Sequence, residues 1–145
     1  MNTKEIISKA QQWIKAPFDV ATRNEIQELL TSDSKDLTDR FYKDLEFGTG
    51  GMRGVMGAGT NRINKYTLGK NTQGLSNYLL QSFPDKQPKV AIAFDCRHNS
   101  QLFAQSVADV FSANNIIVYL FEDLRATPEL SYAVRALDCD AGIVL

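Results

Sequence analysis

Cysteine and histidine are scarce in this sequence, which contains only Cys96, Cys139 and His98 of these two types. Two cysteines are too few for a disulfide framework, and neither has a second cysteine at CxxC spacing. No apolar signal segment follows Met1, so we expect reduced thiols in a cytoplasmic protein. A structural zinc ion needs four ligands close together. We therefore predict no metal site within this chain.

Long apolar runs and an excess of positive charge are also missing. The 16 Lys and Arg residues stand against 17 Asp and Glu residues, which gives a net charge of −1. Such a chain has no general attraction for nucleic acids or anionic membranes. No apolar run reaches the length of a membrane span. We therefore expect neither nucleic acid nor membrane as a partner, and any basic site must be local.

The 145 residues can form one domain, or one domain with an appended arm. Residues 1–45 are predicted to form a helical N-terminal arm, with a capping-box pattern at Thr22 and Glu25 that favours a helix start. The apolar residues that recur at helical spacing in this arm are Ile6, Ala10, Trp13, Ile14, Leu37, Phe41 and Leu45.

Residues 46–145 are predicted to form an α/β domain. Buried-strand runs at 89–94, 116–121 and 141–145 alternate with two helical patterns. The first helical pattern places Leu102 on its inward face. The second is predicted to begin with Thr127 as N-cap and Pro128 at the first helical position. Strands that alternate with helices imply right-handed crossovers and parallel pairing. The predicted fold is a three-layer α/β/α arrangement with a mixed, mainly parallel sheet, preceded by the helical arm.

The sequence stops at the third of these strands. Ligands of open α/β sheets bind beyond the carboxyl ends of the strands. The loop where chemistry is expected would follow Leu145, so we expect the chain to be a fragment of a longer protein.

The loops that follow the first two of these strands carry acids and arginines. Asp95, Arg97 and His98 precede one helix and Arg125 precedes the next. Helix N-termini attract anions, so these side chains suit a phosphate neighbourhood. The alternatives are that Asp95 braces the loop through Arg97, that His98 is a surface residue and that Arg125 is a solvated charge.

Six of the nine glycines lie between Glu46 and Asn64. The spacing fails both nucleotide motifs, because Arg53 replaces the third glycine of a dinucleotide fingerprint and Thr60 replaces the lysine of a Walker A loop. Two interpretations remain open at this point. The glycines turn backbone amides toward an anion that Arg53 also binds, or they form a hairpin with Arg53 merely exposed.

Several separated motifs in the last hundred residues resemble the N-terminal domain of the α-D-phosphohexomutases, the family of phosphoglucomutase and phosphomannomutase. The long helical arm is similar to the branch that contains phosphoglucomutase and phosphopentomutase. The motifs, in order, are "FGTGGMRG", "MGAGTNRIN", "TQGLSNYL", "FDCRHNS" and "TPELSYAVRALDCDAGIVL".

The resemblance implies a parent enzyme that interconverts hexose 1-phosphate and hexose 6-phosphate through a phosphoserine and a bisphosphate intermediate. It implies that the serine follows Leu145, that no catalytic residue lies within this chain and that the fragment alone is inactive. Mg²⁺ ligands, a sugar bisphosphate primer and the other three domains belong to the rest of that enzyme, whose substrates are sugar phosphates.

The resemblance also implies roles for particular residues of this chain. Thr49, Gly50 and Arg53 are expected beside the phosphoserine loop. Asp95 and Arg97, with His98, are expected to support the neighbouring strand end.

Two other functions are consistent with the residues. One is a stand-alone phosphate- or nucleotide-binding module without catalysis, and the other is an interaction domain whose helical arm docks a partner.

Overall fold

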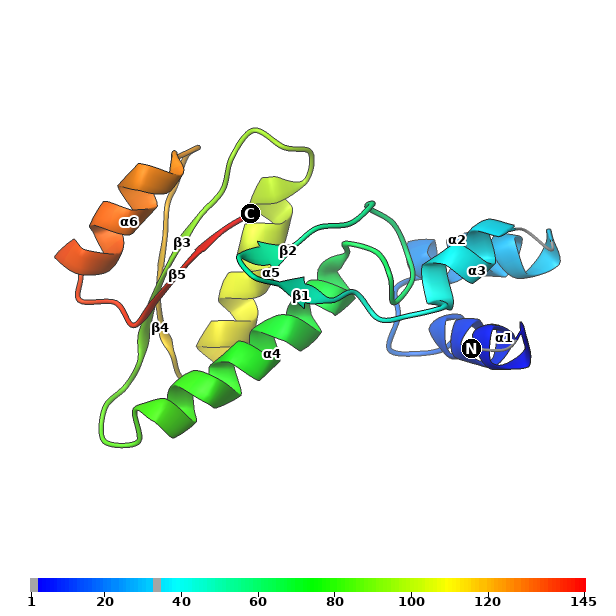
Figure 1. Ribbon diagram of the computed structural model, residues 1–145, viewed down its shortest axis with the longest axis horizontal. Coiled ribbons are helices and arrows are strands. Elements are labelled where there is room, and N and C mark those ends of the chain that lie inside the picture. The colour runs from blue at the N-terminus through cyan, green and yellow to red at the C-terminus, as the bar shows by residue number, and fades with distance from the viewer. Residues whose placement is uncertain (1–2, 33–34) are drawn as a thin grey trace. The chain divides into compact units, whose positions relative to one another are not determined.

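The computed structural model describes residues 3–32 and 35–145 (Figure 1). The chain divides into two compact units, one ending at Thr67 and the other beginning at Leu68. Each unit is described in turn. Residues 1, 2, 33 and 34, which the arm prediction included, lie outside the described residues.

The first unit begins with three helices, α1 (Thr3–Trp13), α2 (Val20–Thr31) and α3 (Lys35–Phe41). Trp13 is buried and stacks on the ring of Phe18, with the ring centroids 4.4 Å apart. The prediction that Leu45 continues the third helix is wrong, because α3 ends at Phe41. Ile14 lies just after the end of α1 and is only partly buried against the core. The helical pattern of Ile6, Ala10, Trp13, Leu37 and Phe41 is confirmed by burial, since the core of this unit consists of Ile6, Ala10, Trp13, Ile26, Leu37, Phe41 and Ala58.

Asp19 is the N-cap of helix α2, which begins at Val20, so the predicted capping role of Thr22 is wrong. The Asp19 carboxylate accepts a hydrogen bond from the backbone N–H of Thr22 at 2.9 Å, as an N-cap residue does. It also accepts the Tyr66 hydroxyl at 2.8 Å and lies 2.9 Å from the Lys65 ammonium. Asp19 therefore joins α2 to a segment more than forty residues later in the chain. Glu25 bonds elsewhere, to Arg40.

The remainder of the first unit contains two very short strands, β1 (Phe47–Gly48) and β2 (Gly51–Met52), and the start of α4 (Lys65–Ser82). The strands pair antiparallel, with Phe47 opposite Met52.

The second unit contains a three-stranded parallel sheet of β3 (Lys89–Ala93), β4 (Ile117–Leu120) and β5 (Ala141–Val144). The strand order is β4-β3-β5, so β3 is central and carries the most deeply buried side chains. Helices α5 (Ser100–Ala113) and α6 (Thr127–Ala136) cover opposite faces of the sheet (Figure 1). The α/β fold is confirmed. Within residues 3–32 and 35–145 the three-stranded sheet is entirely parallel rather than mixed, and antiparallel pairing occurs only in the separate β1–β2 hairpin.

Side-chain size sets the packing of α6 on the sheet. Ala91 and Ala93 of β3 pack with Leu130 of α6. A Cβ atom on Gly142 of β5 would lie 2.6 Å from Val134 of α6, so only glycine permits this close approach.

Two local predictions in the second unit are wrong. Leu102 is 68% exposed because it lies on the outer face of α5, away from the sheet. Helix α6 has Ala126 as N-cap, so Thr127 and Pro128 are its first two helical residues. Ala126 has no side chain that can accept an N–H of the first turn, and its own N–H donates to the Glu129 carboxylate at 3.5 Å.

None of the helices formed by residues 3–32 and 35–145 combines the length and the apolar character needed to cross a membrane.

The Asp19 contacts predict how the stability of the first unit depends on pH. The Thr22 N–H, followed by Lys65 and Tyr66, holds the pKa of Asp19 well below its ordinary value of 3.8. A carboxylate with a lowered pKa stabilises the fold above its unfolded pKa, and this contribution disappears as the pH falls through the folded value. The substitution Asp19→Ala should therefore lower the free energy of unfolding by about 1–2 kcal/mol near neutral pH.

Urea unfolding of both chains from pH 6 to pH 2 measures this effect. The difference between wild type and Asp19→Ala should stay constant above about pH 5 and shrink below about pH 4. Asp85→Asn, which removes an exposed carboxylate of the second unit, controls for loss of one negative charge. A difference that does not change with pH would contradict the assigned role of the ionised Asp19 carboxylate.

Candidate functional site

The first group of predicted site residues lies in the β1–β2 hairpin. Thr49 and Gly50 form the turn between the two strands, and Arg53 follows β2; all three are exposed. Gly51 has a φ of 141°, a conformation that side-chain-bearing residues rarely adopt. Among the residues that the structure describes, the Arg53 side chain makes no hydrogen bond or ion pair. The hairpin therefore presents peptide groups and one guanidinium that has no partner within the described part of the chain.

The base of this hairpin is bonded to the segment 57–64. The Leu45 N–H donates to the Thr60 carbonyl at 2.8 Å, on the side where the chain enters the hairpin. On the side where the chain leaves, the Ile63 N–H donates to the Val55 carbonyl at 2.9 Å. The same short segment thus fixes both ends of the hairpin.

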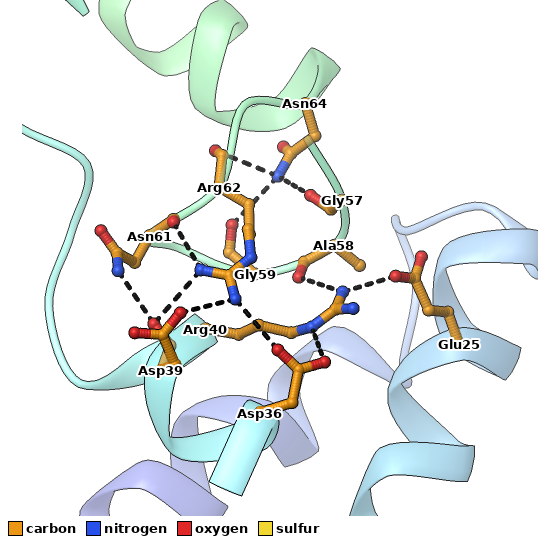
Figure 2. Close-up of polar contacts among 10 residues, drawn as sticks. All are labelled: Glu25, Asp36, Asp39, Arg40, Gly57, Ala58, Gly59, Asn61, Arg62 and Asn64. Carbon is orange, nitrogen blue, oxygen red and sulfur yellow. Dashed lines mark hydrogen bonds and ion pairs between the residues drawn. The ribbon is translucent and has the colours of Figure 1, made fainter. Parts of the chain in front are cut away.

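Segment 57–64 is in turn held on α3 by two arginines (Figure 2). The Arg62 guanidinium, whose side chain is only 6% exposed, donates to Asp36 at 3.0 Å and to Asp39 at 2.7 Å. Arg40 of α3 donates to the other oxygen of Asp36 at 2.8 Å and to the Ala58 carbonyl at 3.0 Å. Asp36 therefore bridges the two arginines.

The positive charges of Arg40 and Arg62, which are largely shielded from water, are balanced by neighbouring carboxylates. Burial acts to raise the pKa of Asp36, but hydrogen bonds from Arg40 and Arg62 outweigh it and hold that pKa below its ordinary value. Arg40 has a second carboxylate partner in Glu25 of α2. The network thus connects α2, α3 and the loop that carries the hairpin base.

Backbone contacts complete the network. The Asn61 N–H donates to the Arg40 carbonyl at 2.9 Å. The Asn64 amide donates to the carbonyls of Gly57 and Gly59 at 2.8 and 3.0 Å (Figure 2). Its oxygen accepts the Thr67 N–H at the start of α4. The loop is therefore closed on itself as well as on α3.

Sequence reasoning missed these structural residues. Arg62 lies in the same glycine-rich stretch as Arg53, but only Arg53 was predicted as a site residue. The available signal was the pair of acids at Asp36 and Asp39, three residues apart on a helix, which can flank one guanidinium.

The second group of predicted site residues lies at the carboxyl ends of the strands. The Asp95 N–H donates to the Leu145 carbonyl at 2.9 Å, which continues the β3–β5 pairing, and the Arg125 N–H donates to the Phe94 carbonyl at 3.1 Å. The ends of β3 and β5 and the loop after β4 therefore meet at one edge of the sheet.

Asp95 and Arg97 form a bidentate pair at this edge. The Asp95 carboxylate accepts the Arg97 Nε and backbone N–H groups and the Ser100 hydroxyl, at 2.9–3.2 Å. The Arg97 side chain, followed by its N–H, lowers the pKa of Asp95 to about 2. The loop-bracing pair is thus formed, and its position beside a phosphate stays a prediction.

The two remaining candidates at this edge differ in their contacts. His98 is exposed. Arg125 is not a free charge, because its guanidinium lies 3.4 Å from the Glu129 carboxylate and donates to the Leu124 carbonyl at 2.7 Å. Arg125 is therefore a partly exposed loop charge that is also paired with Glu129.

The structure thus brings Thr49, Gly50 and Arg53 together in the first unit, and Asp95, Arg97 and His98 together in the second. Within residues 3–32 and 35–145, no three His, Cys, Asp or Glu side chains are grouped so that they could hold a metal ion. The chemistry that these groups can perform is anion binding and loop support.

Comparison with known proteins relates this geometry to a family. The family described as phosphoglucomutase/phosphomannomutase, alpha/beta/alpha domain I, matches residues 44–145. A phosphoglucomutase of Staphylococcus epidermidis RP62A is 45% identical over 101 residues, which are 70% of this chain and 18% of that protein. A phosphoglucomutase of Staphylococcus aureus MRSA252 is 39% identical over 133 residues, which are 92% of this chain and 23% of that protein.

The chain thus spans about a fifth of the length of the curated relatives that it matches. No solved structure matches it. The matched region includes both groups of candidate residues.

Two glycines provide a matched test of the hairpin and its support. Gly59 has a φ of 129°, and a Cβ atom there would lie 2.8 Å from the backbone oxygen of Arg40. Gly59→Ala should therefore cost about 2 kcal/mol or more of unfolding free energy. Gly50→Ala, where a Cβ atom meets nothing within 4 Å, should change it by less than about 0.5 kcal/mol. Denaturant unfolding of both variants measures the difference, and equal costs would contradict the packing described for Gly59.

The Asp95–Arg97 pair can be tested by titration. Arg97→Gln should raise the pKa of Asp95 from about 2 toward its ordinary value of 3.8, because the main hydrogen-bond donor to the carboxylate is lost. The backbone N–H of residue 97 remains and should keep the pKa below 3.8. NMR titration of the carboxyl carbon measures it. Arg125→Gln removes an arginine that pairs with Glu129 and should leave the Asp95 titration unchanged; an equal effect of both substitutions would contradict the assignment.

Proposed function

The chain belongs to the phosphoglucomutase/phosphomannomutase family through the α/β/α domain I of that family, and we propose that it is the first domain of a hexose-phosphate mutase. The longer protein then interconverts hexose 1-phosphate and hexose 6-phosphate through a phosphoserine and a bisphosphate intermediate, as an intramolecular phosphotransferase of the isomerase class. The observation that carries this proposal is the continuous match over residues 44–145, which takes in the hairpin and the strand edge.

The hairpin is proposed to bind charge on the transferring phosphoryl group. Phosphoryl transfer depends on positioning and on cationic groups and N–H donors that stabilise negative charge on oxygen. Arg53 is exposed and makes no ion pair among the described residues, whereas Arg62 is bonded to two carboxylates. Arg53 is therefore the arginine of this stretch that is available to an anion, with Thr49 and Gly50 beside it.

The strand edge is proposed to support the loop that carries the phosphoserine. Ligands of α/β sheets bind beyond the carboxyl ends of strands, and Leu145 is bonded to Asp95 at such an end. A serine that follows Leu145 would emerge beside the Asp95–Arg97 pair, with His98 on the same loop. On this proposal the catalytic serine is supplied outside the present chain, which alone is inactive.

The rest of the protein is proposed to supply what this chain does not. Mg²⁺ would supply positive charge to the phosphoryl oxygens, and the described residues offer no cluster of three metal ligands. We assign its ligands, the sugar-binding loops and the binding of the bisphosphate primer to the three remaining domains. The protein is proposed to be a cytoplasmic phosphoprotein.

Activity measurements on the full-length protein test the role of Arg53. With glucose 1-phosphate, Mg²⁺ and a glucose bisphosphate primer, Arg53→Gln should lower kcat/KM about 10²–10³-fold, as loss of one charge-stabilising donor does. Arg53→Lys should recover part of this loss, because lysine keeps the charge but not the bidentate geometry. Arg135→Gln, which removes an exposed arginine of α6, should leave kcat/KM within about twofold.

Two results would overturn the proposal. One is the absence of any hexose-phosphate turnover by the wild-type full-length protein under these conditions. The other is tight binding of glucose 1-phosphate by the 145-residue chain alone in an NMR titration, which would favour a stand-alone binding module.

A further inference from the structure

The β1–β2 hairpin cannot hold its own position. Each strand has two residues, and an isolated hairpin of this length is not stable in water. Phe47 is 67% exposed, so the hairpin has little apolar anchorage at its first strand. Whatever fixes Arg53 in space must therefore act through the base of the hairpin.

That base is held by segment 57–64, and this segment is held by ion pairs and hydrogen bonds, among them the one from the Asn61 N–H to the Arg40 carbonyl, rather than by an apolar core. Ala58 is its one member in the hydrophobic cluster of the first unit. The other anchors are polar: Arg62 on Asp36 and Asp39, and Arg40 on the Ala58 carbonyl (Figure 2).

Hydrogen bonds of this kind favour one arrangement more than they favour the folded state. The Arg62 side chain is 6% exposed, whereas its partners Asp36 and Asp39 are 44% and 59% exposed. Ion pairs whose carboxylates stay in contact with water add little to the free energy of unfolding, whereas their directed hydrogen bonds restrict geometry. Arg62 has several directed contacts, two to carboxylates and one to the Asn61 carbonyl at 3.1 Å. A sideways movement of the loop on α3 breaks more than one of them.

We infer that Arg62 and Arg40 are positioning residues, which bond the N-terminal helices to the base of the glycine hairpin and so set the place of Arg53. The helical arm thereby takes part in the reaction without contacting substrate. This inference rests on the function proposed above for Arg53. On this inference, Asp36 and Asp39 of α3 help to position the hairpin by binding Arg62, although they precede the hairpin in the sequence.

Kinetics of the full-length protein separate positioning from simple stability. Arg62→Gln should lower kcat about 10- to 100-fold, the cost of small misplacement of a charge-stabilising group, with KM within about threefold. Arg62→Lys and Asp39→Asn, which keep part of the contact, should show the same pattern to a smaller extent. Ile26→Ala creates a cavity in the core of the same unit, so it should lower Tm at least as much as Arg62→Gln does. At a temperature where all variants are folded, Ile26→Ala should nevertheless leave kcat within about twofold of wild type.

Amide hydrogen exchange of the full-length protein gives a readout that does not need activity. The N–H groups of Leu45 and Ile63 report the base of the hairpin, and that of Ala10 reports the helical core. In Arg62→Gln, protection at Leu45 and Ile63 should fall at least about tenfold more than protection at Ala10. In Ile26→Ala, all three should fall together.

Each outcome has a definite meaning. Unchanged protection at Leu45 and Ile63 in Arg62→Gln overturns the inference. Loosened amides with an unchanged kcat overturn its catalytic part. An inactive wild-type protein removes the proposed mutase function instead, and the exchange measurement then decides whether Arg62 sets the hairpin base. If Arg62→Gln does not fold, the same comparisons apply to Asp39→Asn.

Discussion

Two guanidinium groups shared among three carboxylates are the constraint on which the first unit depends. Segment 57–64, which carries Arg62, has no helix or strand and one residue in the core, so its conformation comes from directed polar contacts, including those from Arg40 of α3. Arg62 reaches α3 from the loop and Arg40 reaches the loop from α3, with Asp36 accepting from both. Because a buried charge without a partner costs far more than a paired one, the loop has few alternative positions. The segment in turn fixes the base of the hairpin and the first turn of α4 through hydrogen bonds.

The α/β part of the fold could be predicted from the sequence because its signals are local. The run from Val90 to Phe94 is apolar throughout, and burial of these residues in the central strand follows directly. The motifs that identify the family lie mainly in these same regions, which is why fold and family could be predicted together.

The remaining features depend on residues that are far apart in the chain. Asp19 rather than Thr22 caps helix α2. The Tyr66 hydroxyl and the Lys65 ammonium stabilise the Asp19 carboxylate in this position. These two partners lie more than forty residues later, so the sequence around Asp19 does not indicate them. The two arginines of the glycine-rich stretch look equivalent until the acids of α3 single out Arg62. Local patterns give the period of a helix, but they do not give its end or the partner of a charge.

The aromatic packing around Trp13 has a practical consequence. It is the only tryptophan of the chain, and it is buried against Phe18 within the first unit. Its fluorescence emission therefore reports the folding of the helices that carry the arginine network, and the parallel sheet contributes no indole signal. Comparing this emission with far-UV circular dichroism, which averages over the whole backbone, would reveal whether the two compact units melt as one cooperative system or in separate steps.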